Sequence, residues 1–143
     1  MQSLVTYPSL PLGNSRTNRP RLRICIVSNE FVGPFRNGGI GTAYTSMAEA
    51  LAEAGHEVVC LYSEGVRCSE RDIYYWIDEY ASKGLTLVPM PHVRLPFETL
   101  YQAKRSFQAY IWLKQQAPFD YIHYPECQGL GYYISTAKRL GLA

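Results

Sequence analysis

Apolar runs and amphipathic stretches alternate along the first half of the chain. Leu22 to Asn29 (LRICIVSN) is an apolar run that ends in a polar residue, typical of a strand buried on both faces of a parallel sheet. A loop with glycine and proline breakers follows from Glu30 to Gly39. Apolar residues then recur at three- and four-residue spacing, which predicts a helix that Gly55 ends. The apolar face of this helix is Ile40, Tyr44, Met47, Ala48, Leu51 and Ala54.

The alternation continues to the end of the chain. Glu57 to Tyr62 (EVVCLY) is the second predicted strand, which completes a strand–helix–strand unit with a right-handed crossover. The later elements are a helix over Ser69–Ser82, a strand over Gly84–Met90, a helix over Phe97–Gln116, a strand over Phe119–Tyr124 and a helix over Gly129–Leu140. The apolar face of the long helix is Leu100, Ala103, Phe107, Tyr110 and Ile111.

This order predicts an α/β fold in which helices flank a Rossmann-like parallel sheet. We expect residues 1–21, which contain three prolines, to be a flexible lead-in, and residues 22–143 to form the domain. Another strand normally follows the last helix of such a fold, so we expect the domain to be incomplete at its C-terminus.

Composition narrows the class of protein. The content of 47% hydrophobic and 18% charged residues predicts a globular chain. A net charge of only +2 argues against a nucleic-acid-binding protein, which usually has a concentrated basic face. No apolar run is long enough to cross a bilayer. Cys25 and Cys60 lie within apolar strands, and none of the four cysteines has zinc-site spacing, so we expect reduced thiols, no metal and a cytoplasmic protein.

The glycine-rich stretch before the first helix is the main candidate for binding chemistry. Backbone N–H groups at a helix N-terminus are unpaired, and the helix dipole attracts anions there. Glycines allow a phosphate to approach the backbone because no Cβ intervenes. Arg36 could add a charge-assisted hydrogen bond. The predicted phosphate-binding residues are Arg36, Gly38, Gly39, Ile40, Gly41 and Thr42.

Two familiar glycine motifs fit this loop poorly. A P-loop needs Lys and Ser or Thr where Gly39 and Ile40 stand. A dinucleotide fingerprint needs a third glycine where Tyr44 stands, and a loop that follows its strand directly. Glu64, after the second strand, could still imitate a ribose-binding acid, so an NAD-binding domain remains an alternative. A glycine-rich turn that only starts a helix is another.

The run RICIVSNEFVGPFRNGGIGTAYTSMAEALAEAGHEVVCLY resembles the opening of family 4 glycosyltransferases, which have the GT-B fold. The run FDYIHYPECQGLGYYISTAKRLGL is similar to a later strand–helix segment of the same N-terminal domain. The resemblance implies transfer of a sugar from a nucleotide-sugar to a carbohydrate or small-molecule acceptor, with retention and without a cofactor or essential metal. It implies that this domain holds the acceptor and that its glycine loop contacts the donor phosphates.

The resemblance also suggests catalytic and acceptor-binding residues. His123 matches the first histidine of a family H-x-H motif, but Pro125 stands at the place of the second. Glu126 follows where an acidic residue is common. The candidates for acceptor contact are Asn29, Glu30, Tyr75 and Trp76, the last two because aromatic rings stack on sugars.

A GT-B enzyme needs a C-terminal donor-binding domain, so we expect this chain to be inactive alone and to require that domain in cis or in trans. The alternative from a different class is a non-catalytic interaction module. Lys104 and Arg105, next to Phe107 and Trp112, also leave open a helix that contacts a membrane.

Overall fold

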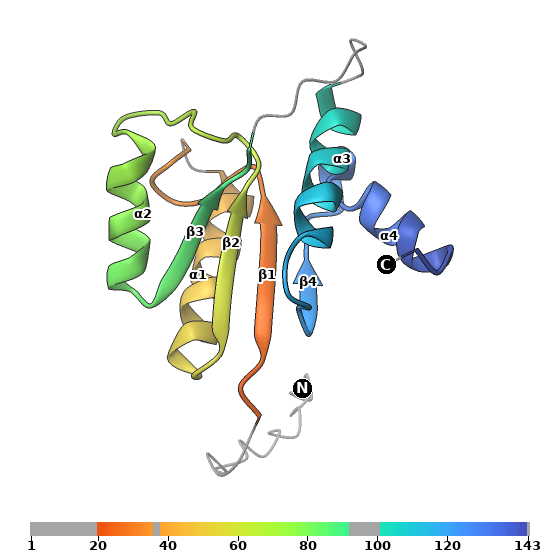
Figure 1. Ribbon diagram of the computed structural model, residues 1–143. Coiled ribbons are helices and arrows are strands. Elements are labelled where there is room, and N and C mark those ends of the chain that lie inside the picture. The colour runs from red at the N-terminus through yellow and green to blue at the C-terminus, as the bar shows by residue number, and fades with distance from the viewer. Residues whose placement is uncertain (1–19, 36–37, 92–100, 143) are drawn as a thin grey trace, which may run out of the picture.

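The computed structural model describes residues 20–35, 38–91 and 101–142 (Figure 1). Its strands are β1 (Arg23–Ser28), β2 (Glu57–Tyr62), β3 (Leu85–Pro89) and β4 (Tyr121–His123). Its α-helices are α1 (Gly39–Glu53), α2 (Ile73–Ser82), α3 (Tyr101–Lys114) and α4 (Tyr132–Arg139), and a 3₁₀ turn, Cys127–Gly129, lies between β4 and α4. The predicted order and type of these elements are confirmed. Residues 1–19 of the expected lead-in, and Arg36, lie outside the described residues.

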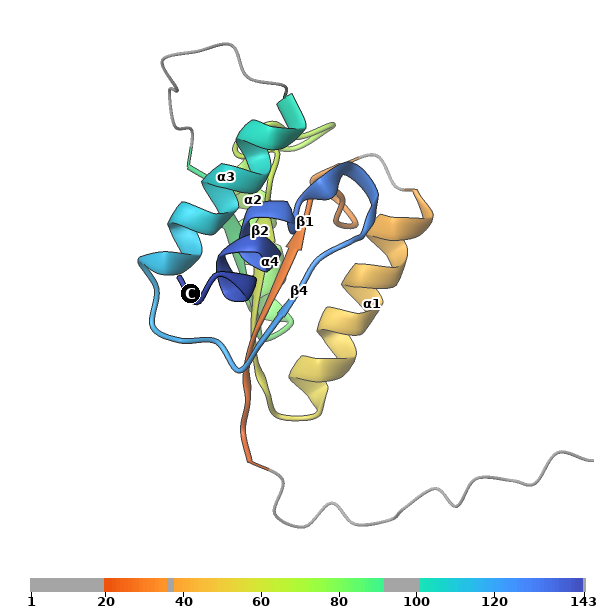
Figure 2. The same cartoon turned by 90° about the vertical axis from the view of Figure 1, so that its right-hand side faces the viewer.

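The described strands form one parallel sheet in the order β3-β2-β1-β4. The chain moves outward from β1 through β2 to β3, and then crosses back over the sheet to place β4 on the other side of β1. Right-handed crossovers put helices that precede and follow this reversal on opposite faces. Accordingly, α1 and α2 cover one face and α3 and α4 the other. Figure 2 shows α1 across the sheet from α3 and α4. The predicted Rossmann-like α/β fold is therefore confirmed.

Strand β1 supplies both halves of the core because successive side chains point to opposite faces. Ile24 and Ile26 pack with Val58 and Cys60 of β2 under α1 and α2. Cys25 and Val27 pack on the other face, beneath α3 and α4. All six residues are buried.

The loop after β1 is fixed to the first layer by a buried polar network. The backbone N–H of Val32 donates to Thr45 Oγ1 of α1 at 2.9 Å, and the Tyr80 hydroxyl of α2 donates to the Val32 carbonyl at 2.9 Å. Gly33, with φ of 104°, lies against the ring of Trp76, and a Cβ built on it would be 2.2 Å from that ring. Helices α1 and α2 thus fix the position of this loop.

The side of α3 that faces the protein differs from the amphipathic prediction. Its buried residues are Arg105, Ser106, Gln108 and Ala109, whereas the predicted Phe107 and Tyr110 are only half-buried. The buried polar groups are paired: Arg105 forms an ion pair with Glu64, and Ser106 Oγ accepts from the backbone of Tyr133 at 3.1 Å. A hydrophobic periodicity cannot reveal a helix face whose burial depends on such partners.

We expect Gly33→Ala to lower the free energy of unfolding by at least about 2 kcal/mol, because left-handed backbone costs other residues about 1–2 kcal/mol and overpacking about 1–3 kcal/mol. Gly39→Ala is the control: its Cβ would meet nothing within 4 Å. Urea unfolding followed by circular dichroism measures both. Equal midpoints for the two variants would contradict the packing described for Trp76.

Stability should fall in alkali because of the buried thiols. Burial raises the pKa of Cys25 from 9.0 to about 12, although Arg23 opposes the shift, and burial also raises the pKa of Cys60. The unfolded chain therefore releases these protons first, so stability is complete below pH 9 and is lost as pH rises toward 12, by up to about 1.4 kcal/mol per pH unit and thiol.

Urea unfolding between pH 8 and 11, under reducing conditions, tests this dependence. Buried Tyr62 and Tyr80 have raised pKa values as well, mainly through burial, and act in the same direction. Cys25→Ala should therefore show a shallower loss than the parent chain, and an identical slope would argue against the burial of this thiol.

Candidate functional site

The reversal of strand order makes the carboxyl ends of β1 and β4 the switch point of this sheet. Open α/β sheets bind ligands in a crevice at such switch points because the connecting loops diverge there, and we call this expected ligand position the crevice. Asn29 and Glu30 follow β1, and Glu126 follows β4. Helix α1 starts at the same edge, and Figure 2 shows the turn after β4 beside it. The structure thus brings His123, Glu126, Glu30 and the start of α1 to the carboxyl ends of β1 and β4.

Among the described residues, no side chain caps the start of α1. Gly38 is its N-cap residue in an extended conformation, and a backbone bond runs from Thr42 N–H to the Gly38 carbonyl at 3.2 Å. The N–H groups of Gly39, Ile40 and Gly41 belong to the first turn, where backbone N–H groups have no partner within the helix. These amides form the donor end of a helix dipole.

The side chain of Glu30 occupies part of the space that the glycines leave. A Cβ on Gly38 would lie 2.8 Å from Glu30 Oε2, and one on Gly41 would lie 3.3 Å from Glu30 Cβ. A Cβ on Gly39 would meet nothing within 4 Å. The space beside Gly38 and Gly41 is thus taken by the Glu30 side chain, whose carboxylate interacts favourably with the helix dipole. Among these three glycines, Gly39 is the one at which an added Cβ would meet no described atom.

Tyr44 of α1 joins the site, although its place on the apolar face had suggested only core packing. Its ring lies against that of His123, with centroids 5.2 Å apart. The pKa of Tyr44 is raised, chiefly by burial and further by negative charge on Cys127 and Glu126. His123 itself is exposed.

Ser28 and Asn29 are buried polar residues at the carboxyl end of β1. Ser28 is fully buried, and its hydroxyl bonds both the N–H and the carbonyl of Glu30, at 3.1 Å and 3.0 Å. Asn29 is only 5% exposed, and its Oδ1 has no hydrogen-bond partner among the described residues. An unpaired buried acceptor is uncommon and marks Asn29 as a position that can receive a donor from a ligand.

The aromatic residues predicted to contact an acceptor lie elsewhere. Tyr75 and Trp76 belong to α2, which packs on β3 at the sheet edge farthest from β4. Trp76 is half-buried against the loop at Gly33, and Tyr75 is exposed with the Arg71 guanidinium 5.1 Å from its ring centre. The structure therefore does not bring these two residues together with His123 and Glu126.

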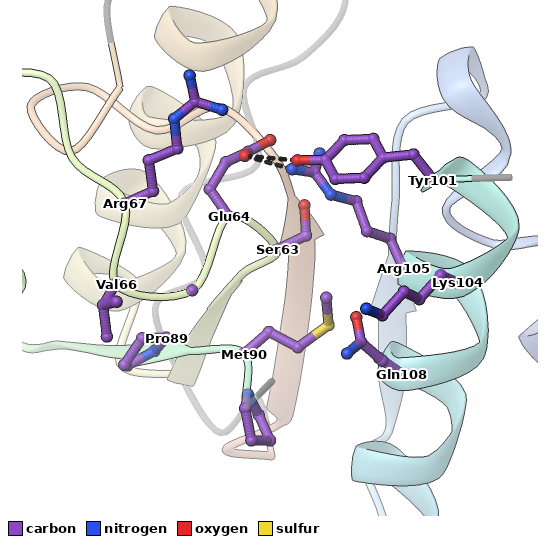
Figure 3. A pocket seen from close by; sticks show the side chains of 12 residues that line it. Ser63, Glu64, Val66, Arg67, Pro89, Met90, Tyr101, Lys104, Arg105 and Gln108 are labelled. Carbon is purple, nitrogen blue, oxygen red and sulfur yellow. Dashed lines mark hydrogen bonds and ion pairs between the residues drawn. The ribbon is translucent and has the colours of Figure 1, made fainter. Parts of the chain in front are cut away.

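A cavity lies at the carboxyl ends of β2 and β3, against α3. This cavity has a volume of about 320 Å³ and includes Glu64, Lys104 and Arg105 in its wall (Figure 3). The Glu64 carboxylate is engaged by Arg105 and by the Tyr101 hydroxyl, so it is not the unpaired acid that the NAD interpretation needs. Arg105 is buried and does not face outward as a membrane-contacting residue would.

No group of three potential metal ligands occurs among the described residues, and none of the described helices is long and apolar enough to cross a membrane. Comparisons with protein-family models, with characterised proteins and with solved structures found no match to this chain. A functional proposal therefore depends on the sequence motifs and on how the residues after β1, after β4 and at the start of α1 are arranged.

Glu126→Gln should lower the pKa of Tyr44, because removing a nearby negative charge makes ionisation of the phenol easier. Burial is the larger cause of the raised value, so most of the shift should remain. Carbon-13 NMR of labelled tyrosine measures the titration. The control is Glu53→Gln, at the exposed opposite end of the same helix. Equal effects of the two variants would place Glu126 away from Tyr44.

Proposed function

We propose that this chain is the acceptor-side domain of a retaining glycosyltransferase that uses a nucleotide-sugar. The observation that carries the proposal is the meeting of a glycine-rich helix start with Glu30 at the switch point of a Rossmann-like sheet. The two matching sequence runs supply these parts: the first contains the loop and α1, and the second contains β4 and α4.

The two kinds of group in the crevice suit the two substrates. Gly39 is exposed, and its backbone amide in the first turn of α1 can donate to a phosphate oxygen of the donor. The carboxylate of Glu30 and the amide oxygen of Asn29 accept hydrogen bonds, which suits the hydroxyl groups of a sugar acceptor. Because Glu30 lies beside the same helix start, donor and acceptor would meet there.

The segment after β4 departs from the sequence pattern of family 4 glycosyltransferases. Pro125 is buried where a second histidine would stand. His123 packs on Tyr44, which suits a positioning role, and Glu126 is an exposed carboxylate after β4 that can contact a sugar hydroxyl. In this proposal the second wall of the cleft, and with it most contacts to the nucleotide, comes from a separate donor-binding domain.

Saturation-transfer NMR with UDP-glucose, ADP-glucose and GDP-mannose tests binding, since it detects the weak affinity expected of half a site. We expect at least one donor to bind the parent chain. Gly39→Ala should weaken that binding roughly tenfold, about 1.4 kcal/mol, because its methyl group fills the approach to the backbone.

Ser46→Ala is the matched control, as an exposed single-atom change two turns further along α1. Gly39→Ala should be at least as stable as the parent, so lost binding cannot be attributed to unfolding. The proposal fails if none of the donors binds, or if the two variants bind alike.

A further inference from the structure

The cavity beside α3 has the features of a second ligand site, separate from the crevice at β4. It lies outside the carboxyl ends of β2 and β3, where residues 63–67 and 89–91 meet the first half of α3. Its volume of about 320 Å³ falls within the range of small-molecule sites. Figure 3 shows Lys104 and Gln108 on one side and Met90 and Val66 on the other.

An ion pair in the wall of this cavity links α3 to the end of β2. Arg105 and Glu64 form an ion pair whose side chains are 6% and 7% exposed, and the Tyr101 hydroxyl donates to the same carboxylate at 3.0 Å. The Arg105 guanidinium also lies 3.7 Å from the centre of the Tyr101 ring. Separating two buried charges leaves each without its partner, which is strongly destabilising. The pair therefore keeps α3 next to the end of β2.

The charges of the described lining residues do not balance. Arg67, Lys104 and Arg105 are cationic, and Glu64 is the one acid among the residues that line the cavity, which leaves a net charge of +2. Arg105 and Glu64 satisfy each other. Within the described part of the chain, no carboxylate lies at ion-pair distance from Lys104 or Arg67. The uncompensated charge favours an anion.

A buried hydroxyl adds to this preference. Ser63 is 4% exposed, and its Oγ has no hydrogen-bond partner among the described residues. It lies in the cavity wall near the Glu64–Arg105 pair (Figure 3). A serine hydroxyl moves between staggered rotamers at small cost, so it can turn its proton toward an oxygen in the cavity. The unpaired group would thereby gain the bond that it lacks.

The rest of the wall is apolar. Pro89, Met90 and Val66 line the side opposite α3, and Val66 is 74% exposed. A bare inorganic ion would leave this surface in water, whereas an organic group would cover it.

We propose that this cavity binds a small organic oxyanion, a phosphate ester or a carboxylate, with its charge at Lys104 and its apolar body on Met90 and Pro89. This goes beyond the proposed glycosyl transfer, because none of these residues belongs to the crevice at β4 and the site requires no partner domain.

The probes are phenyl phosphate, benzoate and benzyl alcohol, titrated into the full 143-residue chain and followed by two-dimensional NMR. Phenyl phosphate should bind and shift the signals of residues 63–67 and of α3. Benzoate binding as well would show that any organic oxyanion suffices, and phenyl phosphate alone would identify a phosphate-ester site. Equal binding of neutral benzyl alcohol would overturn the proposal.

Three variants separate this site from the crevice. Lys104→Gln should weaken phenyl phosphate binding at least about tenfold, whereas Lys138→Gln, at an exposed lysine of α4, should not. Ser63→Ala should weaken binding about two- to threefold without lowering the melting temperature, since it removes an unpaired buried hydroxyl. If Gly39→Ala weakens binding and Lys104→Gln does not, the anion binds at the crevice and the second site is rejected.

Discussion

Burial of β1 on both faces and along both edges is the constraint on which the rest of the structure depends. Its backbone bonds to β2 on one side and to β4 on the other, and its side chains enter both cores. A parallel strand in this position needs helices above and below it. The chain meets that need by returning across the sheet after β3, and this return makes the carboxyl ends of β1 and β4 the switch point of the sheet.

The sequence predicts such a fold well because its signals are local. The apolar runs of β1 and β2 and the glycine at position 55, with φ of 92°, mark where elements begin and end. The prediction fails where burial depends on distant partners. Arg105 looks like a surface residue in the sequence, yet it is buried because Glu64, 41 positions earlier, pairs with it. Hydrophobic patterning contains no trace of that pairing.

The glycine loop shows the same limit at the candidate site. Three glycines at the start of a helix indicate close approach of some group to the backbone, but they do not say which group. A Cβ added at Gly38 or Gly41 would meet the side chain of Glu30, whereas one added at Gly39 would meet nothing within 4 Å. Tyr44 was predicted as a core residue from its spacing, and its contact with His123 depends on the register of β4 beside β1. Sequence order alone does not fix that register.

The shortness of β4 affects how this sheet meets other chains. Among the described strands, β4 and β3 are the two at the edges, and an exposed edge is a template for backbone pairing and aggregation. Strand β4 has three residues, and β3 ends in Pro89, which has no N–H to donate. Neither edge offers a long hydrogen-bonding ladder. A protein that docked against β4 would therefore gain few backbone hydrogen bonds and would depend on side chains such as Tyr121, which is 63% exposed.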